Sequence, residues 1–198
     1  MRLIRRAEFA PRRLGVFPGG FHPPTRAHLA LAEAALAHVD EVLFVLPESF
    51  PHKTYDGVGL DDRLAMLAAA SSRPEFSIGI SRGGLFIDIA REARETHEAA
   101  EIYILCGRDA AERIVGWDYG EPGAFARMLD EFQMLVAARA GGYAPPAGLA
   151  ARIHPLAVEG NWDEVSATEV RRRIREGEPW ASLIPEAIED AVRRLYSP

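Results

Sequence analysis

The sequence predicts an α/β fold, in which helices cover both faces of a doubly wound parallel sheet. Short apolar runs of strand length alternate with helical patterns along the chain, as they do in such folds. Several runs are continuously apolar, which is typical of parallel strands buried on both faces. The chain has 198 residues, of which 48% are hydrophobic, so it can bury a substantial core.

The predicted elements follow one another in a regular order. Strands are expected at residues 14–17, 42–47, 76–80, 102–106 and 134–138, with a shorter one at 153–156. Helical patterns occupy residues 27–37, 62–70, 86–97 and, less regularly, 110–129. Right-handed crossovers between parallel strands then give a Rossmann-like arrangement. The end of the chain reads as C-terminal helices, two of them, broken at residues 177–179.

A single domain, residues 1–198, is expected. Residues 1–12 are basic and are expected to form an N-terminal tail or a short lead-in to the first strand. Residues 166–196 are expected to form a C-terminal helical part, which carries the second of two phosphate motifs. The arginine-rich N-terminus is compatible with the interface of a homo-oligomer.

The composition excludes several classes of protein. A net charge of −6 disfavours a nucleic-acid-binding protein, because such proteins are usually basic, but small phosphorylated ligands remain compatible with it. Cys106 is the sole cysteine, so no intramolecular disulfide can form, and its apolar neighbours predict a buried thiol. No apolar run reaches membrane-spanning length, and no secretion signal is apparent. A cytoplasmic location is therefore expected by default.

The stretch LGVFPGGFHPPTRAHL, residues 14–29, joins a strand to a helix through a turn at Gly19 and Gly20. Such a junction offers unpaired N–H groups and the positive end of a helix dipole, which predicts a phosphate site. Thr25 and His28 are three residues apart and lean toward this helix start. A histidine there can donate to a phosphate oxygen as charge develops. The alternative is that Thr25 only caps the helix and His28 lies on the surface.

A second anion site is predicted in VSATEVRRR, residues 165–173. Ser166 and Glu169 fit a capping box, which begins a helix just after Ser166. A phosphate there could accept hydrogen bonds from three sources. These are the free N–H groups of the helix, the hydroxyls of Ser166 and Thr168, and the guanidinium of Arg171 one turn later. A purely structural role is the alternative, since capping boxes are common and arginine runs are usually solvated.

The loop of residues 48–59 is long enough to be a lid or a substrate loop. It carries His52 and Lys53. A lysine on such a loop is a point charge that can fold over a polyphosphate. Most loop lysines have no specific partner, so this signal is weak alone, and the same holds for His52.

The segment CGRD begins at Cys106, the last residue of the strand predicted at residues 102–106. Gly107 and Asp109 therefore lie where ligands bind in open α/β sheets. Asp109 would accept hydrogen bonds from a ribose or an amide, or it would cap the next helix. Trp117 would stack on a flat ring, or it would belong to the core.

The order of these signals is more specific than any one of them. The sequence resembles the nucleotidylyltransferases, in particular the nicotinate- or nicotinamide-mononucleotide adenylyltransferases. The first motif of that family is matched by GGFHPPTRAH and the second by VSATEVR. Further likeness lies in FPHK, DDRLAML, GRD with a following tryptophan, VAARAG and IPEAIEDAVRRLY, so it runs from about residue 14 to residue 196. The departures from the family pattern are His22, Thr25, Ala27 and Ala167, and a shift of Gly19 and Gly20 by one position.

The resemblance implies an enzyme of NAD biosynthesis that moves an adenylyl group from ATP to the phosphate of a pyridine mononucleotide and releases pyrophosphate. The substrate phosphate attacks directly, so the protein aligns the groups and stabilises charge. Mg²⁺ is expected to bridge phosphate oxygens, and no side chain is assigned to the metal. ATP and the mononucleotide are the expected partners, without nucleic acid or membrane.

The resemblance also implies roles for particular residues. His28 contacts the α-phosphate, and the second motif binds the β- and γ-phosphates. The catalytic positions are Thr25, His28, Lys53 and Arg171. The nucleotide-binding positions are Gly19, Gly20, Phe21, Gly107, Asp109, Ser166, Thr168 and Arg171, and the mononucleotide-binding positions are His52, Lys53, Trp117 and Arg139.

Two alternatives stay open. One is the same transfer to another acceptor, such as phosphopantetheine, or a cytidylyl transfer, since those enzymes share both end motifs. The other is a catalytically silent nucleotide-binding module, to which the replacements at Thr25, Ala27 and Ala167 give some weight. Retention of both His28 and Arg171, together with Lys53, argues against the silent module. The choice between the acid and the amide mononucleotide is also open.

Overall fold

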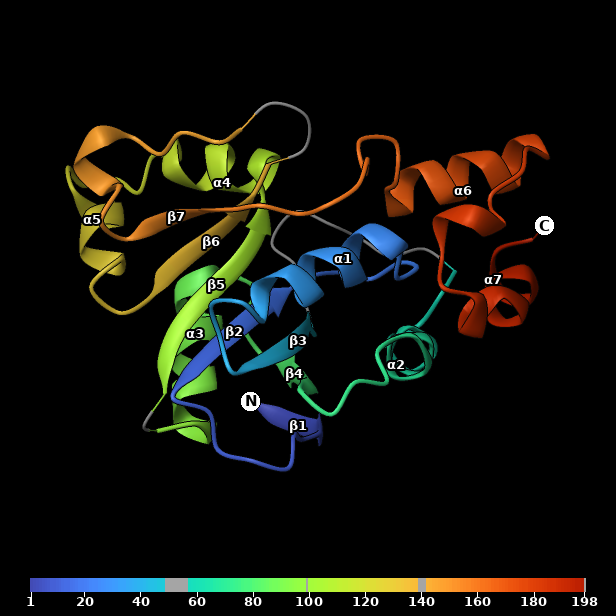
Figure 1. Ribbon diagram of the computed structural model, residues 1–198, viewed down its shortest axis with the longest axis horizontal. Coiled ribbons are helices and arrows are strands. Elements are labelled where there is room, and N and C mark those ends of the chain that lie inside the picture. The colour runs from blue at the N-terminus through green and yellow to red at the C-terminus, as the bar shows by residue number, and fades with distance from the viewer. Residues whose placement is uncertain (49–56, 99, 139–141, 198) are drawn as a thin grey trace.

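The computed structural model describes residues 1–48, 57–98, 100–138 and 142–197. Its centre is a seven-stranded sheet with the order β1-β4-β3-β2-β5-β6-β7 (Figure 1). All neighbouring strands are parallel except β1, which runs antiparallel to β4. The strands are β1 (Arg2–Arg5), β2 (Arg13–Pro18), β3 (Glu41–Pro47), β4 (Phe76–Ser81), β5 (Glu101–Gly107), β6 (Gln133–Ala137) and β7 (Ile153–Leu156). The six strands expected from the apolar runs are thereby confirmed, within a residue or two.

The expected N-terminal tail is wrong for residues 2–5, which form the edge strand β1. Leu3 pairs with Gly79, and Arg5 donates from Nη2 to the hydroxyl of Ser71 at 2.9 Å and from Nε to the carbonyl of Phe76 at 3.2 Å. Exposed and half-buried side chains alternate over only four residues. A strand of four residues, two of them arginines, leaves little apolar signal in the sequence.

Helices connect the strands, in the order α1 (Arg26–Ala35), α2 (Leu60–Ala70), α3 (Phe86–Thr96), α4 (Arg108–Val115), α5 (Ala124–Met128), α6 (Ala167–Glu176) and α7 (Glu189–Tyr196). Short 3-10 turns occur at η1 (Ala147–Leu149), η2 (Ala181–Leu183) and η3 (Glu186–Ile188). The long helix expected at 110–129 is instead α4 and α5. Gly120 and Gly123 between them have left-handed φ angles of 77° and 73°, which a helix does not accommodate. The expected break after α6 is confirmed at Gly177, which has φ 70°.

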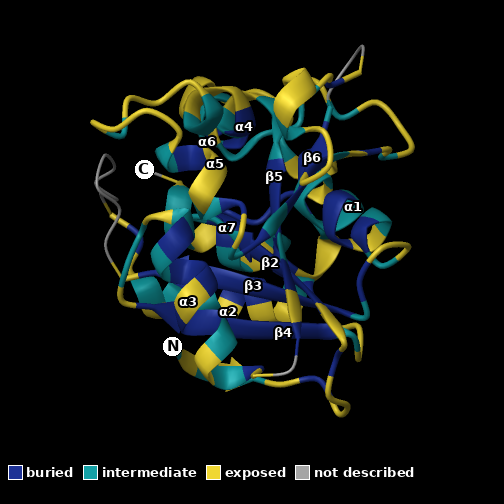
Figure 2. Cartoon of the chain, turned by 90° about the vertical axis from the view of Figure 1, so that its left-hand side faces the viewer, coloured by how far each residue is buried: buried dark blue, intermediate teal, exposed yellow. Residues whose placement is uncertain are grey.

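Both faces of the sheet are covered, as expected for a doubly wound fold. In β3, Leu43 and Val45 belong to one core cluster, which includes residues of α3, α4 and α5. Phe44 points to the opposite face and joins a second cluster with residues of α1 and α2. Figure 2 shows the resulting band of buried strands between more exposed helices. Cys106 is buried in the first cluster, and burial raises the pKa of its thiol to about 12, as expected of an inert cysteine.

The C-terminal helices pack at one end of the molecule, beside α2 (Figure 1). Met66 of α2, Val170 and Ile174 of α6, and Val192 of α7 form a third apolar cluster. Arg26, at the start of α1, donates from Nε to the carbonyl of Ile184 at 3.1 Å and so joins this part to α1. None of the helices in the described ranges has the length and apolar character needed to cross a membrane.

The chain changes direction across the sheet at β2. From β2 it continues through β3 to β4 on one side, while β5, β6 and β7 extend on the other. The connections after β2 and β5 therefore diverge and leave a crevice at the carboxyl ends of these two strands. Ligands of open α/β sheets bind in such a crevice.

Candidate active site

A cavity of about 420 Å³ lies at this crevice. Phe17 and Gly107 contribute the carboxyl ends of β2 and β5. The N-termini of two ten-residue helices meet there, since Thr25 and His28 line it from α1 and Ser166 lines it from α6. Two sets of helix N–H groups and two dipoles thus converge on one volume, which favours an anionic ligand.

The start of α1 holds His28 in a defined orientation. Thr25 is fully buried and is the N-cap residue, as one of the two interpretations of the sequence predicted. The backbone N–H of Thr25 donates to Nδ1 of His28 at 3.0 Å, and Oγ1 of Thr25 lies 2.8 Å from the same nitrogen. Because Nδ1 accepts from a backbone amide, the proton of the neutral ring resides on Nε2. The capping contact therefore makes Nε2–H the donor of this histidine.

Phe21 supports the ring of His28 from behind. It is almost completely buried and has an unusual φ of 43° for a residue other than glycine. Its ring centroid lies 5.2 Å from that of His28 in an edge-to-face arrangement, and 5.5 Å from those of Phe17 and Phe44. This aromatic cluster fixes the position of the imidazole from the sheet side.

The glycine turn is tied into the fold by backbone bonds. The N–H of Gly19 donates to the carbonyl of Val45 at 3.0 Å, so this amide is engaged within the sheet. The carbonyl of Gly20 accepts from Nη1 of Arg63 at 3.1 Å, and Nε of Arg63 donates to the carbonyl of Gly59 at 3.3 Å. Arg63, on α2, therefore joins the turn to the start of its own helix, a role that the sequence analysis did not foresee.

The start of α6 forms the opposite wall. Ser166 is the N-cap, and its Oγ accepts from the N–H of Glu169 at 3.1 Å, as the capping box predicted. The carboxylate of Glu169 instead binds Arg172 and Arg173, both at 2.7 Å. These two guanidinium groups lower the pKa of Glu169 to about 2.

Arg171 bridges the two phosphate motifs. Its Nη2 lies 3.4 Å from Oγ1 of Thr168, and its Nη1 donates to the carbonyl of His22 in the glycine turn. His22 is buried against Tyr196, with ring centroids 5.1 Å apart. Burial, followed by the charges of Arg171 and Arg63, lowers the pKa of His22 to about 4, so this ring is neutral at pH 7.

Of the predicted residues that the structure describes, Thr25, His28, Gly107 and Ser166 line this cavity. Gly19, Gly20, Phe21, Thr168 and Arg171 lie behind its lining, and Asp109 and Trp117 also lie outside it. Asp109 is exposed in the first turn of α4, and Gly107 is the N-cap, so the expectation that Asp109 caps the helix is wrong. His52, Lys53 and Arg139 lie outside the described residues.

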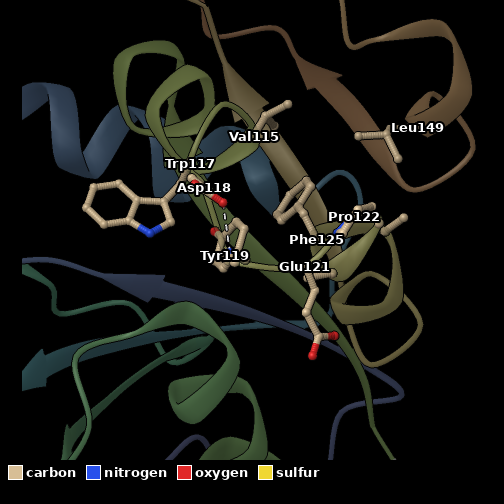
Figure 3. A pocket seen from close by; sticks show the side chains of 12 residues that line it. Val115, Trp117, Asp118, Tyr119, Glu121, Pro122, Phe125 and Leu149 are labelled. Carbon is tan, nitrogen blue, oxygen red and sulfur yellow. Dashed lines mark hydrogen bonds between the residues drawn. The ribbon is translucent and has the colours of Figure 1, made fainter.

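Trp117 lies just beyond the far end of α4, a helix of eight residues that spans about 12 Å. Its side chain is about half exposed, at 51%, so the expectation of a core tryptophan is wrong. It lines a separate hollow of about 450 Å³, in which Tyr119 and Phe125 stack with ring centroids 6.0 Å apart. Figure 3 shows the indole of Trp117 directed away from Phe125 and Pro122.

The sequence analysis missed the segment between β7 and α6. Val158, Gly160, Asn161, Trp162 and Asp163 all line the cavity. The signal was available, because the Gly-Asn pair marks a turn directly before the second phosphate motif. The turn was overlooked because it carries no charged motif, and such a turn is usually only a connection between two elements.

The cavity fits a metal ion that arrives with a nucleotide. Within the described residues, no group of three or more His, Cys, Asp or Glu side chains is placed to hold a metal. Mg²⁺ commonly uses one or two protein carboxylates, with phosphate oxygens and water in its other positions. Asp163 is the one carboxylate among the described residues that line the cavity.

Comparison with known proteins identifies the family. A family model described as cytidylyltransferase-like matches residues 16–173, a stretch that runs from β2 into α6 and includes both helix starts. The chain belongs to the cytidylyltransferase-like family. This family membership confirms the resemblance to nucleotidylyltransferases that the two end motifs indicated.

Relatives within the family match nearly the whole chain. A protein of Thermus thermophilus named "Probable nicotinate-nucleotide adenylyltransferase" is 32% identical over 184 residues, which cover 89% of this chain and 94% of the relative. A protein of Shouchella clausii with the same name is 32% identical over 201 residues, with coverage of 93% and 97%.

A solved structure of the Plasmodium falciparum nicotinic acid mononucleotide adenylyltransferase, complexed with NaAD, is similar with a TM-score of 0.70. It is 16% identical in sequence, with coverage of 92% of this chain and 95% of that one. The similarity confirms the Rossmann-like α/β fold with C-terminal helices.

Proposed function

We propose that this chain is a nicotinate-nucleotide adenylyltransferase of NAD biosynthesis, which moves the adenylyl group of ATP to the phosphate of nicotinate mononucleotide. The observation that carries the proposal is the meeting of two helix N-termini, with His28 and Ser166, on one cavity at the switch point of the sheet. The names of the relatives that match about nine tenths of the chain favour the nicotinate substrate over other acceptors.

The reaction requires no nucleophile from the protein. A phosphate oxygen of the mononucleotide forms a bond to the α-phosphorus of ATP, and the bond from that phosphorus to the β-phosphate oxygen breaks. The electron pair leaves with pyrophosphate. The work of the protein is to align the attacking and leaving oxygens and to stabilise the charge that develops on the phosphates.

His28 is the residue we assign to the α-phosphate. The Thr25 amide holds its Nδ1, so Nε2–H is the donor that faces developing negative charge. Thr25 acts as a positioning residue in this scheme, through both its amide and its hydroxyl. Phe21 and Gly19 act indirectly. Phe21 packs against the imidazole, and Gly19 leaves room for the ring of Phe21.

The start of α6 is assigned to the β- and γ-phosphates. Ser166 accepts a hydrogen bond from the Glu169 amide and still has its own hydroxyl hydrogen to donate. Arg171 brings a guanidinium to the same region, beside Thr168. Lys53 is proposed to close over the leaving pyrophosphate. Mg²⁺ on the triphosphate, approached by Asp163, would neutralise part of the phosphate charge.

The acceptor is proposed to lie along α4. Gly107 stands at its start, Asp109 is exposed in its first turn, and Trp117 follows its far end. In this scheme Trp117 stacks on the pyridine ring, while Asp109 keeps its expected contact with a ribose or the adenosine of the nucleotide. His52 and Arg139 are assigned to the same mononucleotide.

The test is pyrophosphate release from ATP and Mg²⁺ with nicotinate mononucleotide, nicotinamide mononucleotide or phosphopantetheine as acceptor. We expect the fastest release with nicotinate mononucleotide. Release with phosphopantetheine alone would replace the proposal by another acceptor. ATP binding without release from any acceptor would instead indicate a silent nucleotide-binding module.

A further inference from the structure

Trp162 lines the same cavity as His28 and Ser166, but none of the roles above uses it. It lies four residues before Ser166, on the segment that leads from β7 into α6. The wall that it forms is therefore continuous with the helix start assigned to the β- and γ-phosphates. Trp117, the other tryptophan considered for stacking, lies beyond the far end of α4 and lines a different hollow.

The indole of Trp162 is fixed by contacts within its own segment. Its Nε1 donates to the carbonyl of Glu159 at 2.6 Å, and its backbone carbonyl accepts from the N–H of Val165 at 3.1 Å. Oδ1 of Asn161 accepts from the N–H of Asp163 at 3.2 Å and closes the turn around it. The ring thus has a defined orientation in the protein alone, which lowers the entropic cost of using it to bind a ligand.

Gly160 is required for this arrangement. It has a left-handed φ of 99°, and a Cβ atom there would lie 3.0 Å from Nε1 and 3.1 Å from Cε2 of the indole. The ring therefore rests against a backbone that has no side chain. Because Nε1 is already bonded to Glu159, what the indole has left to offer a ligand is its aromatic surface.

A nucleoside triphosphate presents two chemically different ends to this cavity. Its phosphates match the two helix N-termini. Its base is a flat aromatic ring, which needs a binding surface of its own apart from the phosphate site. Apolar side chains of Val158 and Leu31 line the cavity together with Trp162. A fixed indole on the wall of a cavity with a partly apolar lining suits the stacking of a base, and such stacking depends little on the identity of the base.

We propose that Trp162 is the platform on which the base of the nucleoside triphosphate stacks. The proposal rests on the proposed function, because it takes ATP as the nucleotide whose phosphates lie at α6. It divides the two tryptophans between the substrates, with Trp162 serving the triphosphate and Trp117 the acceptor. Stacking then supplies affinity for ATP, while the phosphate contacts supply its alignment.

The experiment compares ATP with inorganic tripolyphosphate, which carries the phosphates without a base. Binding of each probe is measured by calorimetry for the wild type, Trp162→Ala and Trp162→Phe, with Trp180→Phe as a matched tryptophan control. We expect Trp162→Ala to weaken the affinity for ATP roughly 5- to 150-fold, the range given by loss of one base–aromatic stack, and to leave the affinity for tripolyphosphate unchanged. Trp162→Phe should restore most of the ATP affinity.

An equal loss of affinity for ATP and for tripolyphosphate in Trp162→Ala would overturn the proposal, because the residue would then only support the start of α6. Unchanged ATP affinity, or a loss confined to nicotinate mononucleotide, would overturn it as well. The proposed function fails in a different way, namely if the wild type binds ATP but releases no pyrophosphate with a pyridine mononucleotide. A base platform would survive that result.

Discussion

Replacing Gly19 with alanine would place a Cβ atom 2.8 Å from Cζ of Phe21 and 3.0 Å from its Cε2. Real side chains do not approach this closely, so either the ring or the turn must move. The ring has little room, because Phe17, Phe44 and His28 surround it. Gly19 lacks a left-handed φ, so the cost of the substitution is steric and not conformational.

Overpacking of this kind costs about 1–3 kcal/mol of the free energy of unfolding. That is a sizeable share of the roughly 5–15 kcal/mol that stabilises a typical domain. Because the displaced ring supports His28, we also expect turnover to fall while the protein remains folded at 25 °C. Chemical denaturation gives the first quantity, and pyrophosphate release with saturating substrates gives the second.

Gly148→Ala is the matched control, since a Cβ there meets nothing within 4 Å and the position is remote from the turn in sequence. We expect its free energy of unfolding to stay within about 0.5 kcal/mol of the wild type. A double-mutant cycle with Phe21→Leu isolates the contact, because leucine lacks the ring atoms that the new Cβ would meet. A Gly19→Ala cost that is equally large in the Phe21→Leu background would refute the steric reasoning.

Three further predictions follow from the site. His28→Ala should lower kcat by about 10²- to 10³-fold, the usual effect of removing one electrostatic donor, with ATP affinity nearly kept; near-normal turnover would remove this residue from the mechanism. Arg171→Lys should raise the KM for ATP roughly tenfold, because one ammonium cannot span the carbonyl of His22 and the hydroxyl of Thr168 as the guanidinium does; an unchanged KM would contradict the assignment. The pKa of His22 is about 4 in the folded chain and about 6.5 in the unfolded chain. Between these pH values the unfolded state binds more protons, so the free energy of unfolding should fall as the pH drops from about 6.5 to about 4. Denaturation at pH 7 and pH 5 tests this, and His22→Asn should flatten the difference.

Features with a local cause could be predicted from the sequence. The apolar runs of β3 and β5 reveal buried parallel strands because their side chains face covered surfaces on both sides. Thr25 and Ser166 could be recognised as helix caps, because a cap depends on residues three positions away.

Features that depend on contacts distant in sequence could not be predicted. β1 is a strand only because β4 pairs with it. Arg63 reads as one more charge on a helix until the fold brings the carbonyl of Gly20, 43 residues earlier, within reach. Trp162 reads as an ordinary loop residue until β7 and α6 place it on the cavity wall.

The two helix starts that face the cavity have an electrostatic consequence for the protein without ligand. Each helix N-terminus carries a partial charge of roughly +0.5, so α1 and α6 repel each other across the cavity. The chain as a whole is acidic, with a net charge of −6. A bound phosphate would cancel the repulsion and draw the helix starts together. Phosphate ligands should therefore raise the melting temperature of the protein. The bound anion would attract both helix starts and so hold the C-terminal helices to the part of the chain that contains the sheet.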